Sequence, residues 1–115
     1  MKDSSPPGGA LAERAEMIRI TGRVQGVGFR ASAQYLALQY GLRGWVANVG
    51  RGVVIHVCGS AERIESFVVS LHEDMAPPVR IDGLQREPAD MVPRGASFVI
   101  APTDTPLSGR APPQR

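Results

Sequence analysis

The sequence is poor in cysteine and aromatic residues and contains no long apolar run. Its single cysteine, Cys58, excludes an internal disulfide and fits a reducing compartment, so we expect a cytoplasmic protein. No stretch approaches the roughly 20 apolar residues that a membrane-spanning helix needs. The N-terminus also lacks the apolar segment of a secretory signal. Disulfide-stapled and membrane-spanning classes are therefore excluded.

Acidic residues are missing from a long internal stretch. Between Met17 and Ala61 there is no Asp or Glu, whereas the same stretch holds five arginines: Arg19, Arg23, Arg30, Arg43 and Arg51. The net charge is only +2, which does not imply a nucleic-acid binder. A locally positive half nevertheless favours a small anionic partner and steers it electrostatically. For each arginine except Arg30, the alternative interpretation is an ordinary role on an exposed sheet edge.

Both ends of the chain have the composition of disordered segments. Residues 1–16 open with Ser, Pro and Gly, and residues 102–115 carry four prolines with Ser and Gly. We predict a disordered leader over 1–16, one folded domain over 17–101, and a disordered Pro-rich tail over 102–115.

Two amphipathic helices are predicted within that domain. The first spans 29–40, with an apolar stripe at i, i+4, i+7 and i+11, formed by Phe29, Ala33, Leu36 and Tyr40. The second spans about 61–73, with Ser60 as its N-cap and an inward stripe of Ile64, Phe67, Val68 and Leu71.

Alternating or apolar runs predict strands at 17–24, 43–47, 53–58 and 79–86, with a short one at 96–101. The order is β-α-β-β-α-β plus a short terminal strand. This order predicts an α+β, ferredoxin-like split βαβ fold with two helices on one face of an antiparallel sheet. The fold does not by itself indicate a function.

A glycine-rich turn, Gly26-Val27-Gly28, joins the first strand to the first helix. Such a turn can present backbone N–H groups, and the positive end of the following helix adds to them, so the loop can hold an anion. Arg30, in the first helical turn, can direct its guanidinium at the same anion. A plain tight turn is one alternative. A dinucleotide fingerprint is another, but it needs an acid about 20 residues on, and the sequence around Asn48 has none.

Three segments together resemble the acylphosphatase family. The run from Gly22 to Arg30, GRVQGVGFR, is similar to the signature of that family. GWVAN, ending at Asn48, resembles its second motif, and PPVRID, from Pro77 to Asp82, resembles its segment entering the fourth strand. The resemblance covers roughly residues 17–101.

The resemblance implies hydrolysis of acyl phosphates to a carboxylate and inorganic phosphate, with no metal or organic cofactor. Arg30 would bind the phosphate and Asn48 would orient the attacking water. The phosphate would also accept hydrogen bonds from backbone amides, namely those of Gln25, Gly26, Val27, Gly28 and Phe29. We further expect a monomer whose partner is a small acyl phosphate, with neither nucleic acid nor membrane.

One departure from the family pattern lies between Asn48 and Gly59, which is one residue short. We expect the turn to absorb the difference and to leave Val53, Ile55 and Val57 on one face. A misplaced Asn48 would instead favour a non-catalytic, anion-binding regulatory module. A carbamoyl-phosphate-handling module, as in larger maturation proteins, is a third hypothesis. Four other candidate groups are assigned ordinary structural roles: Ser32, His56, Cys58 and His72.

Overall fold

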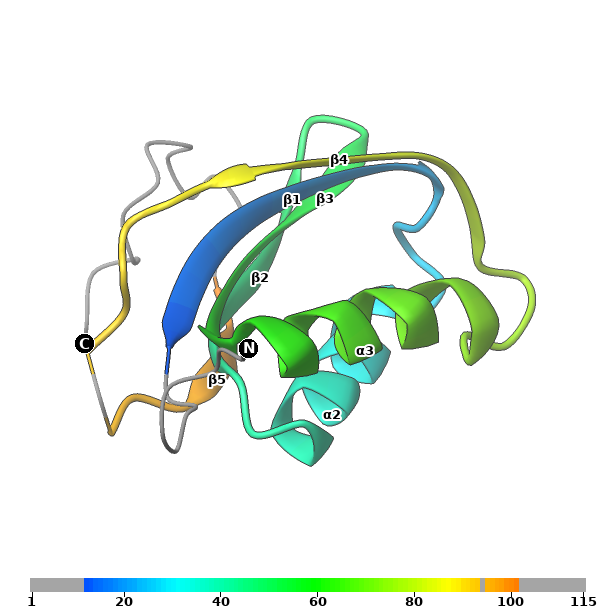
Figure 1. Ribbon diagram of the computed structural model, residues 1–115. Coiled ribbons are helices and arrows are strands. Elements are labelled where there is room, and N and C mark those ends of the chain that lie inside the picture. Colours follow the sequence, from blue (N-terminus) through cyan, green and yellow to red (C-terminus); the bar gives the residue numbers. More distant parts are fainter. Residues whose placement is uncertain (1–11, 94, 102–115) are drawn as a thin grey trace.

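A computed structural model describes residues 12–93 and 95–101 of the chain. It contains seven elements in the predicted order (Figure 1). They are β1 (Glu13–Arg23), α2 (Phe29–Gln39), β2 (Arg43–Val49), β3 (Gly52–Ser60), α3 (Ala61–Glu73), β4 (Arg80–Pro88) and β5 (Phe98–Ile100). No helix within the described ranges is long and apolar enough to cross a membrane.

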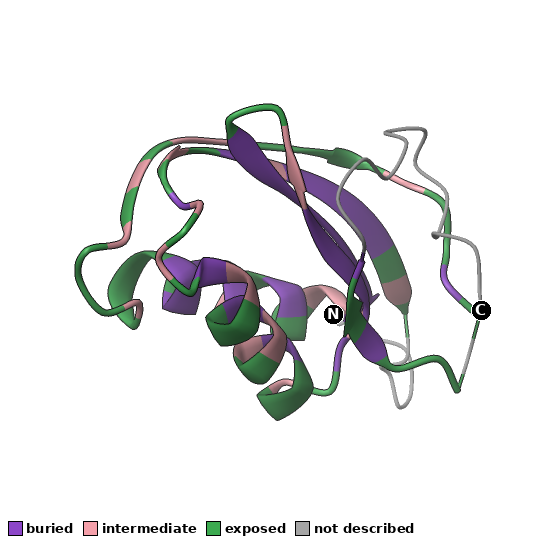
Figure 2. Cartoon of the chain, turned by 180° about the vertical axis from the view of Figure 1, so that it is seen from behind, coloured by how far each residue is buried: buried purple, intermediate pink, exposed green. Residues whose placement is uncertain are grey.

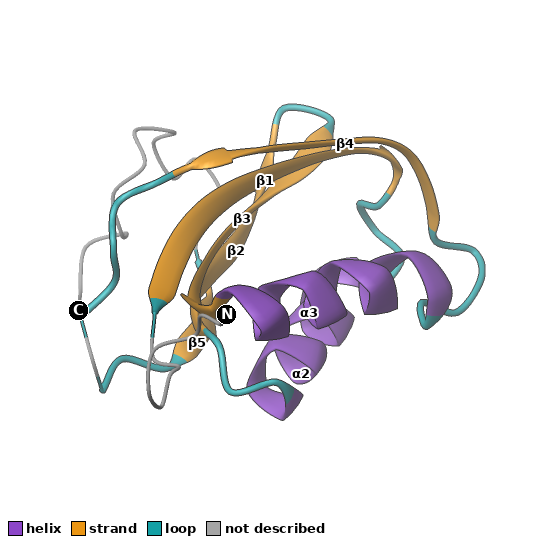
Figure 3. Ribbon diagram, viewed as in Figure 1, coloured by secondary structure: helices purple, strands orange, loops and turns teal. Residues whose placement is uncertain are grey.

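The strands form one sheet in the order β4-β1-β3-β2-β5. Both helices cover the same face of this sheet (Figure 3), which confirms the ferredoxin-like α+β prediction. The prediction of an antiparallel sheet holds for the first four strands, whose pairings are all antiparallel. The short β5 pairs with β2 in parallel, so the complete sheet is mixed.

The core lies between the helices and the sheet. Alternate residues of β3, namely Val53, Ile55 and Val57, point into it, as the sequence predicts. The α2 stripe is shifted slightly, because Ala37 is buried there while Leu36 and Tyr40 are only partly buried against the core. All four predicted α3 positions are buried: Ile64, Phe67, Val68 and Leu71.

The opposite face of β3 is buried as well, which the sequence does not predict. Figure 2 shows the central strands buried along nearly their whole length. Trp45, which is 1% exposed, packs there with Val54 and Ala101. Val92, from the segment after β4, packs on Cys58. An irregular loop therefore covers the face of the sheet opposite the helices.

Strand β1 begins earlier than the predicted domain boundary. The expected leader over 1–16 includes Glu13, yet Glu13 pairs with Ser60 of β3, and the ladder continues without interruption from there. The Glu13 carboxylate also accepts hydrogen bonds from Arg43 at 3.1 Å. These contacts place residues 13–16 in the sheet. Residues 1–11 of the predicted leader and the whole predicted tail, 102–115, lie outside the described residues.

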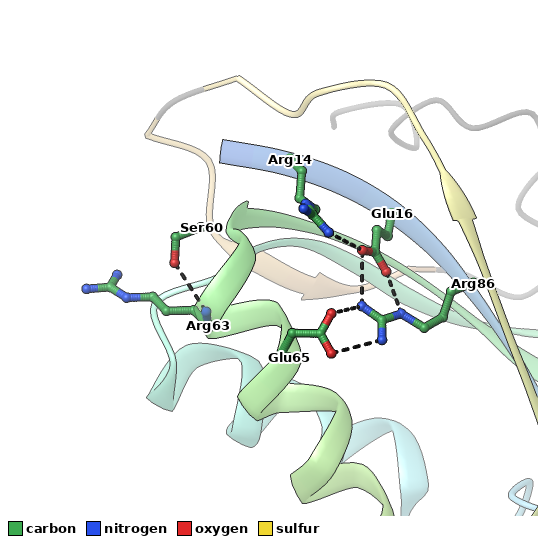
Figure 4. Close-up of polar contacts among 6 residues, drawn as sticks. All are labelled: Arg14, Glu16, Ser60, Arg63, Glu65 and Arg86. Atoms are coloured by element: carbon green, nitrogen blue, oxygen red, sulfur yellow. Dashed lines mark hydrogen bonds and ion pairs between the residues drawn. The ribbon is translucent and has the colours of Figure 1, made fainter. Parts of the chain in front are cut away.

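An ionic network holds the edge strand β4 to its neighbours (Figure 4). Arg86 donates from Nε to Glu16 of β1 at 2.7 Å and from Nη1 to Glu65 of α3 at 3.1 Å. The hydrogen bonds that Arg86 donates to Glu65 and Glu16 raise the pKa of Arg86, and the bond to Glu65 lowers the pKa of that carboxyl group. The network links β4, β1 and α3.

Candidate active site

The loop between β1 and α2 folds as the sequence pattern requires. Gly26 and Gly28 have φ angles of 74° and 81°, in the left-handed region that glycine tolerates best. A Cβ at either position would meet no heavy atom within 4 Å, so the two glycines are needed for their conformation rather than for lack of space. Val27 and Phe29 between and after them pack on the core. The packing of these two side chains therefore holds the backbone of the exposed glycines in place.

The N-terminus of α2 has no side-chain cap among the residues that the structure describes. Its N-cap residue, Gly28, offers no side-chain hydrogen bond, and the first turn contains no acid. In contrast, α3 is capped by Ser60, whose Oγ accepts from the Arg63 N–H at 3.2 Å (Figure 4). The first turn of α3 also carries an acid, Glu62. The first N–H groups of a helix lack intrahelical partners. At α2 they can bind an external anion.

Gln25 joins this loop to the β2–β3 hairpin. Its Nε2 donates to the Gly50 carbonyl at 2.9 Å and to the Gly52 carbonyl at 2.7 Å. The sequence suggested a role only for the backbone amide of Gln25, so this side-chain role was missed. A glutamine next to a glycine-rich turn is not in itself a signal of such a contact. Its effect is to fix the loop and the hairpin relative to each other.

Arg30 is half-buried in the first turn of α2 and has no ionic or hydrogen-bonding partner among the described residues. The structure separates it from two arginines of the same acid-free stretch. Arg43 is bound to Glu13 at 3.1 Å, and Arg19 pairs with Glu87 at 3.1 Å. Those two have structural partners, whereas Arg30 has none among the described residues.

Asn48 lies on β2, opposite Val53 of β3, just before the hairpin turn. It shares strand parity with Val46, which is in the core beneath the helices, so the side chain belongs to the helix face. Its Oδ1 is buried and has no hydrogen-bond partner within the described residues. Since buried polar atoms are normally paired, this acceptor is suited to a bound water or substrate group.

The hairpin absorbs its short length in the turn. Val49 and Gly52 form the last pair of the β2–β3 ladder, so only two residues, Gly50 and Arg51, form the connection. Gly50 has a φ of 58°, as tight two-residue hairpin turns require. Gly52 is needed because a Cβ there would lie 2.3 Å from the Ile20 carbonyl oxygen. The expected facing of Val53, Ile55 and Val57 is thereby preserved.

The other candidate groups lie elsewhere. His56 is fully buried on the face opposite Asn48, where its Nε2 donates to the Asp90 carbonyl at 2.6 Å. Burial lowers the pKa of His56 from its usual 6.5. Cys58 is buried beside Arg43, whose Nη2 lies 3.1 Å from its Sγ. The His72 ring contacts the Val68 carbonyl within α3, and Ser32 is exposed.

Comparison with known proteins gives one family. The acylphosphatase family matches residues 16–100 of the chain. An acylphosphatase of Azoarcus sp. (strain BH72) is 43% identical over 100 residues, which are 84% of this chain and 96% of that protein. The crystal structure of acylphosphatase from Bacillus subtilis superposes with a TM-score of 0.69 at 30% identity, covering 76% of this chain and 97% of that one.

A second kind of relative is much longer than this chain. Carbamoyltransferase HypF2 of Cupriavidus necator is 44% identical over 70 residues. Those residues are 61% of this chain but only 9% of that protein. The chain therefore spans about a tenth of this relative, in contrast to nearly the whole of the Azoarcus protein.

Proposed function

The chain belongs to the acylphosphatase family, and we propose that it hydrolyses acyl phosphates with Arg30 and the backbone amides of residues 25–29 holding the phosphate and Asn48 orienting water. One observation carries the assignment of the site. Within the described part of the chain, the α2 N-terminus has no side-chain cap and its Arg30 has no partner, and Gln25 fixes this loop to the hairpin that bears Asn48. The match along nearly the whole length of a small acylphosphatase supports hydrolysis as the activity.

These groups suit the chemistry of an acyl phosphate. The water oxygen attacks phosphorus, the bond from phosphorus to the acyl oxygen breaks, and the carboxylate leaves. Because that carboxylate is a weak base, it needs no protonation as it departs. Catalysis then depends on positioning and on stabilising charge over the equatorial phosphate oxygens. Arg30 and the loop amides supply the second of these.

Asn48 supplies the positioning. Its Oδ1, buried and without a partner in the described part of the chain, can accept from the attacking water, while its Nδ2 can donate to the phosphate. The water proton passes to a phosphate oxygen, so no side-chain base is required. The proposal routes no step through a metal or organic cofactor, and it keeps the cytoplasm and a small-molecule substrate as its setting.

A second candidate function rests on the match to the carbamoyltransferase. A module of this kind would act on carbamoyl phosphate rather than on a carboxylic acyl phosphate. Assays with benzoyl phosphate and carbamoyl phosphate separate the two. We expect phosphate release from benzoyl phosphate, and release from carbamoyl phosphate alone would favour the second function.

Asn48→Ala tests the assigned roles. We expect turnover of benzoyl phosphate to fall by about 100-fold, since a positioned group is lost. Competitive inhibition by inorganic phosphate should change by no more than a few-fold, because Arg30 and the loop amides remain. Gln34→Ala is the matched control, as it removes an amide that lies one turn further along α2 and donates to the Phe98 carbonyl at 3.0 Å. Equal losses of turnover and of phosphate inhibition in Asn48→Ala would contradict a water-positioning role.

A further inference from the structure

A second positively charged surface lies beside the phosphate-binding loop. An open pocket of about 590 Å³ is formed where β1 ends, where the β2–β3 hairpin turns and where β4 begins. Figure 1 shows these three segments along one edge of the molecule. The residues that line the pocket are Thr21, Gly22, Arg23, Arg51, Arg80 and Asp82. Three cations thus face a single acid.

The positive charges in this pocket are not balanced by the described residues. Arg23 and Arg80 are directly paired across the β1–β4 ladder, and like charges opposite each other destabilise a sheet. Asp82 is engaged by Arg80, whose Nε and Nη2 donate to it at 2.9 and 3.2 Å. Arg23 and Arg51 have no ionic partner in the described ranges. An arrangement that costs stability in the free protein would be stabilised by an anion.

The pocket is coupled to the catalytic loop. Arg23 precedes Gln25 by two residues, and Arg51 is the residue between the two carbonyls, of Gly50 and Gly52, that the Gln25 side chain holds. The loop that binds the transferred phosphate and the turn that carries Arg51 are therefore fixed together. A molecule whose phosphate lies on the loop can extend its other end toward these arginines.

We propose that this arginine pocket, lined by Arg23, Arg51 and Arg80, binds a second anionic group on the acyl part of the substrate. The substrate class is then an acyl phosphate that carries an additional carboxylate or phosphate, because the guanidinium fork matches either group. This inference rests on the proposed function and adds a specificity to it. The catalytic groups contact only the phosphate and cannot supply such a preference.

Substrates that differ by one carboxylate test the proposal. We would compare benzoyl phosphate with 3- and 4-carboxybenzoyl phosphate at low ionic strength. The wild type should show about a tenfold lower KM for at least one carboxylated substrate, as expected for a few exposed charge contacts. Added salt should weaken that preference. For each carboxylated substrate, the quantity to follow is the ratio of its kcat/KM to that of benzoyl phosphate, since this ratio cancels changes that affect both substrates.

Arg51→Gln should bring that ratio close to one, and Arg23→Gln should reduce it. Arg19→Gln is the matched control, because Arg19 lies on the same strand as Arg23 but outside this pocket and pairs with Glu87. This control should keep both the ratio and the hydrolysis of benzoyl phosphate. A wild-type ratio of one, or a ratio that Arg51→Gln leaves unchanged, would overturn the proposal.

Binding can be measured without hydrolysis. Benzylphosphonate and its 3- and 4-carboxy derivatives are stable analogues, and each should raise the melting temperature by occupying the site. A larger shift in melting temperature for a carboxylated analogue, lost in Arg51→Gln, supports the pocket. If that result came together with no turnover of any substrate, only the proposed function would fail. Equal shifts for all three analogues would refute the pocket while leaving hydrolysis unaffected.

Discussion

Arg30→Ala should lower the catalytic activity without lowering the stability of the fold. The arginine is assigned to the equatorial oxygens of the phosphate, where charge spreads in the transition state. Removing a preorganised donor of this kind costs about 100- to 1,000-fold in kcat, and removing an arginine that acts on a transferred phosphoryl group costs about 1,000-fold or more. We therefore expect benzoyl phosphate turnover to fall by at least about 1,000-fold.

The same substitution should not destabilise the fold. Arg30 has no partner among the described residues and lies in the first turn of α2, where a positive charge opposes the helix dipole. Removing that charge should raise the free energy of unfolding of the variant by about 0.3–1 kcal/mol, and alanine is also the better helix former. For a domain of this size, about 1 kcal/mol corresponds to a shift of roughly 4–8 °C. The melting temperature should stay level or rise.

The assay combines benzoyl phosphate hydrolysis with thermal melts followed by circular dichroism, on wild type, Arg30→Ala and Arg30→Lys. Lysine keeps the charge but loses the guanidinium fork, so it should recover only part of the activity. Full turnover in Arg30→Ala would refute the assignment of the site. A melting temperature lowered by more than about 4 °C would instead give Arg30 a structural role and refute the reasoning about the helix end.

Three further perturbations have calculable outcomes. Gln25→Ala removes two hydrogen bonds to the hairpin, so urea titration should show an unfolding free energy lower by about 1–2 kcal/mol, and activity assays should show a lower kcat. An unchanged kcat would mean that the loop and Asn48 are positioned independently. Arg43→Ala removes the hydrogen bonds that Arg43 donates to Glu13 and to the Val92 carbonyl, and it should lower the unfolding free energy by about 2–3 kcal/mol in the same titration with kcat unchanged. Burial lowers the pKa of His56 below 6.5, so the unfolded state takes up the His56 proton at a higher pH than the folded state does. The free energy of unfolding should therefore be unaffected by His56 above about pH 6.5 and should fall as the pH is lowered, by up to about 1.4 kcal/mol per pH unit. Denaturation of wild type and His56→Gln between pH 7.5 and 5 checks this, and equal slopes would contradict it.

Much of the fold could be predicted because local patterns and tertiary packing agree. In α3, the cap at Ser60 and the spacing of Ile64, Phe67 and Leu71 each predict the same helix, and the structure has it over Ala61–Glu73. The positive-φ glycines of the loop were predictable in the same way, since the turn from strand to helix needs them. The facing of β3 followed from its period of two.

What could not be predicted depends on contacts between distant segments. In the sequence, His56 has the features of an ordinary strand residue. Its burial results from the segment that contains Asp90, which folds over the sheet. That segment has no apolar periodicity from which its position could be inferred. Likewise, nothing local distinguishes Arg43 from Arg51. The difference is that β1 brings Glu13 next to Arg43, whereas Arg51 lies on a hairpin turn and has no ionic partner among the described residues.

Features that are unfavourable for the free fold lie together at one end of the sheet. There α2 has no cap, Arg23 is paired with Arg80 across two strands, and Asn48 keeps a buried acceptor without a partner in the described ranges. At the other end of the strands, Arg86 and Arg43 are neutralised by acids on neighbouring elements. Local departures from stabilising patterns are expected at functional sites, where a bound ligand can compensate for them. A substrate with two anionic groups would cap the helix with its phosphate and offset the clustered arginines with its second group, so the distribution of unfavourable features itself supports the location of the site.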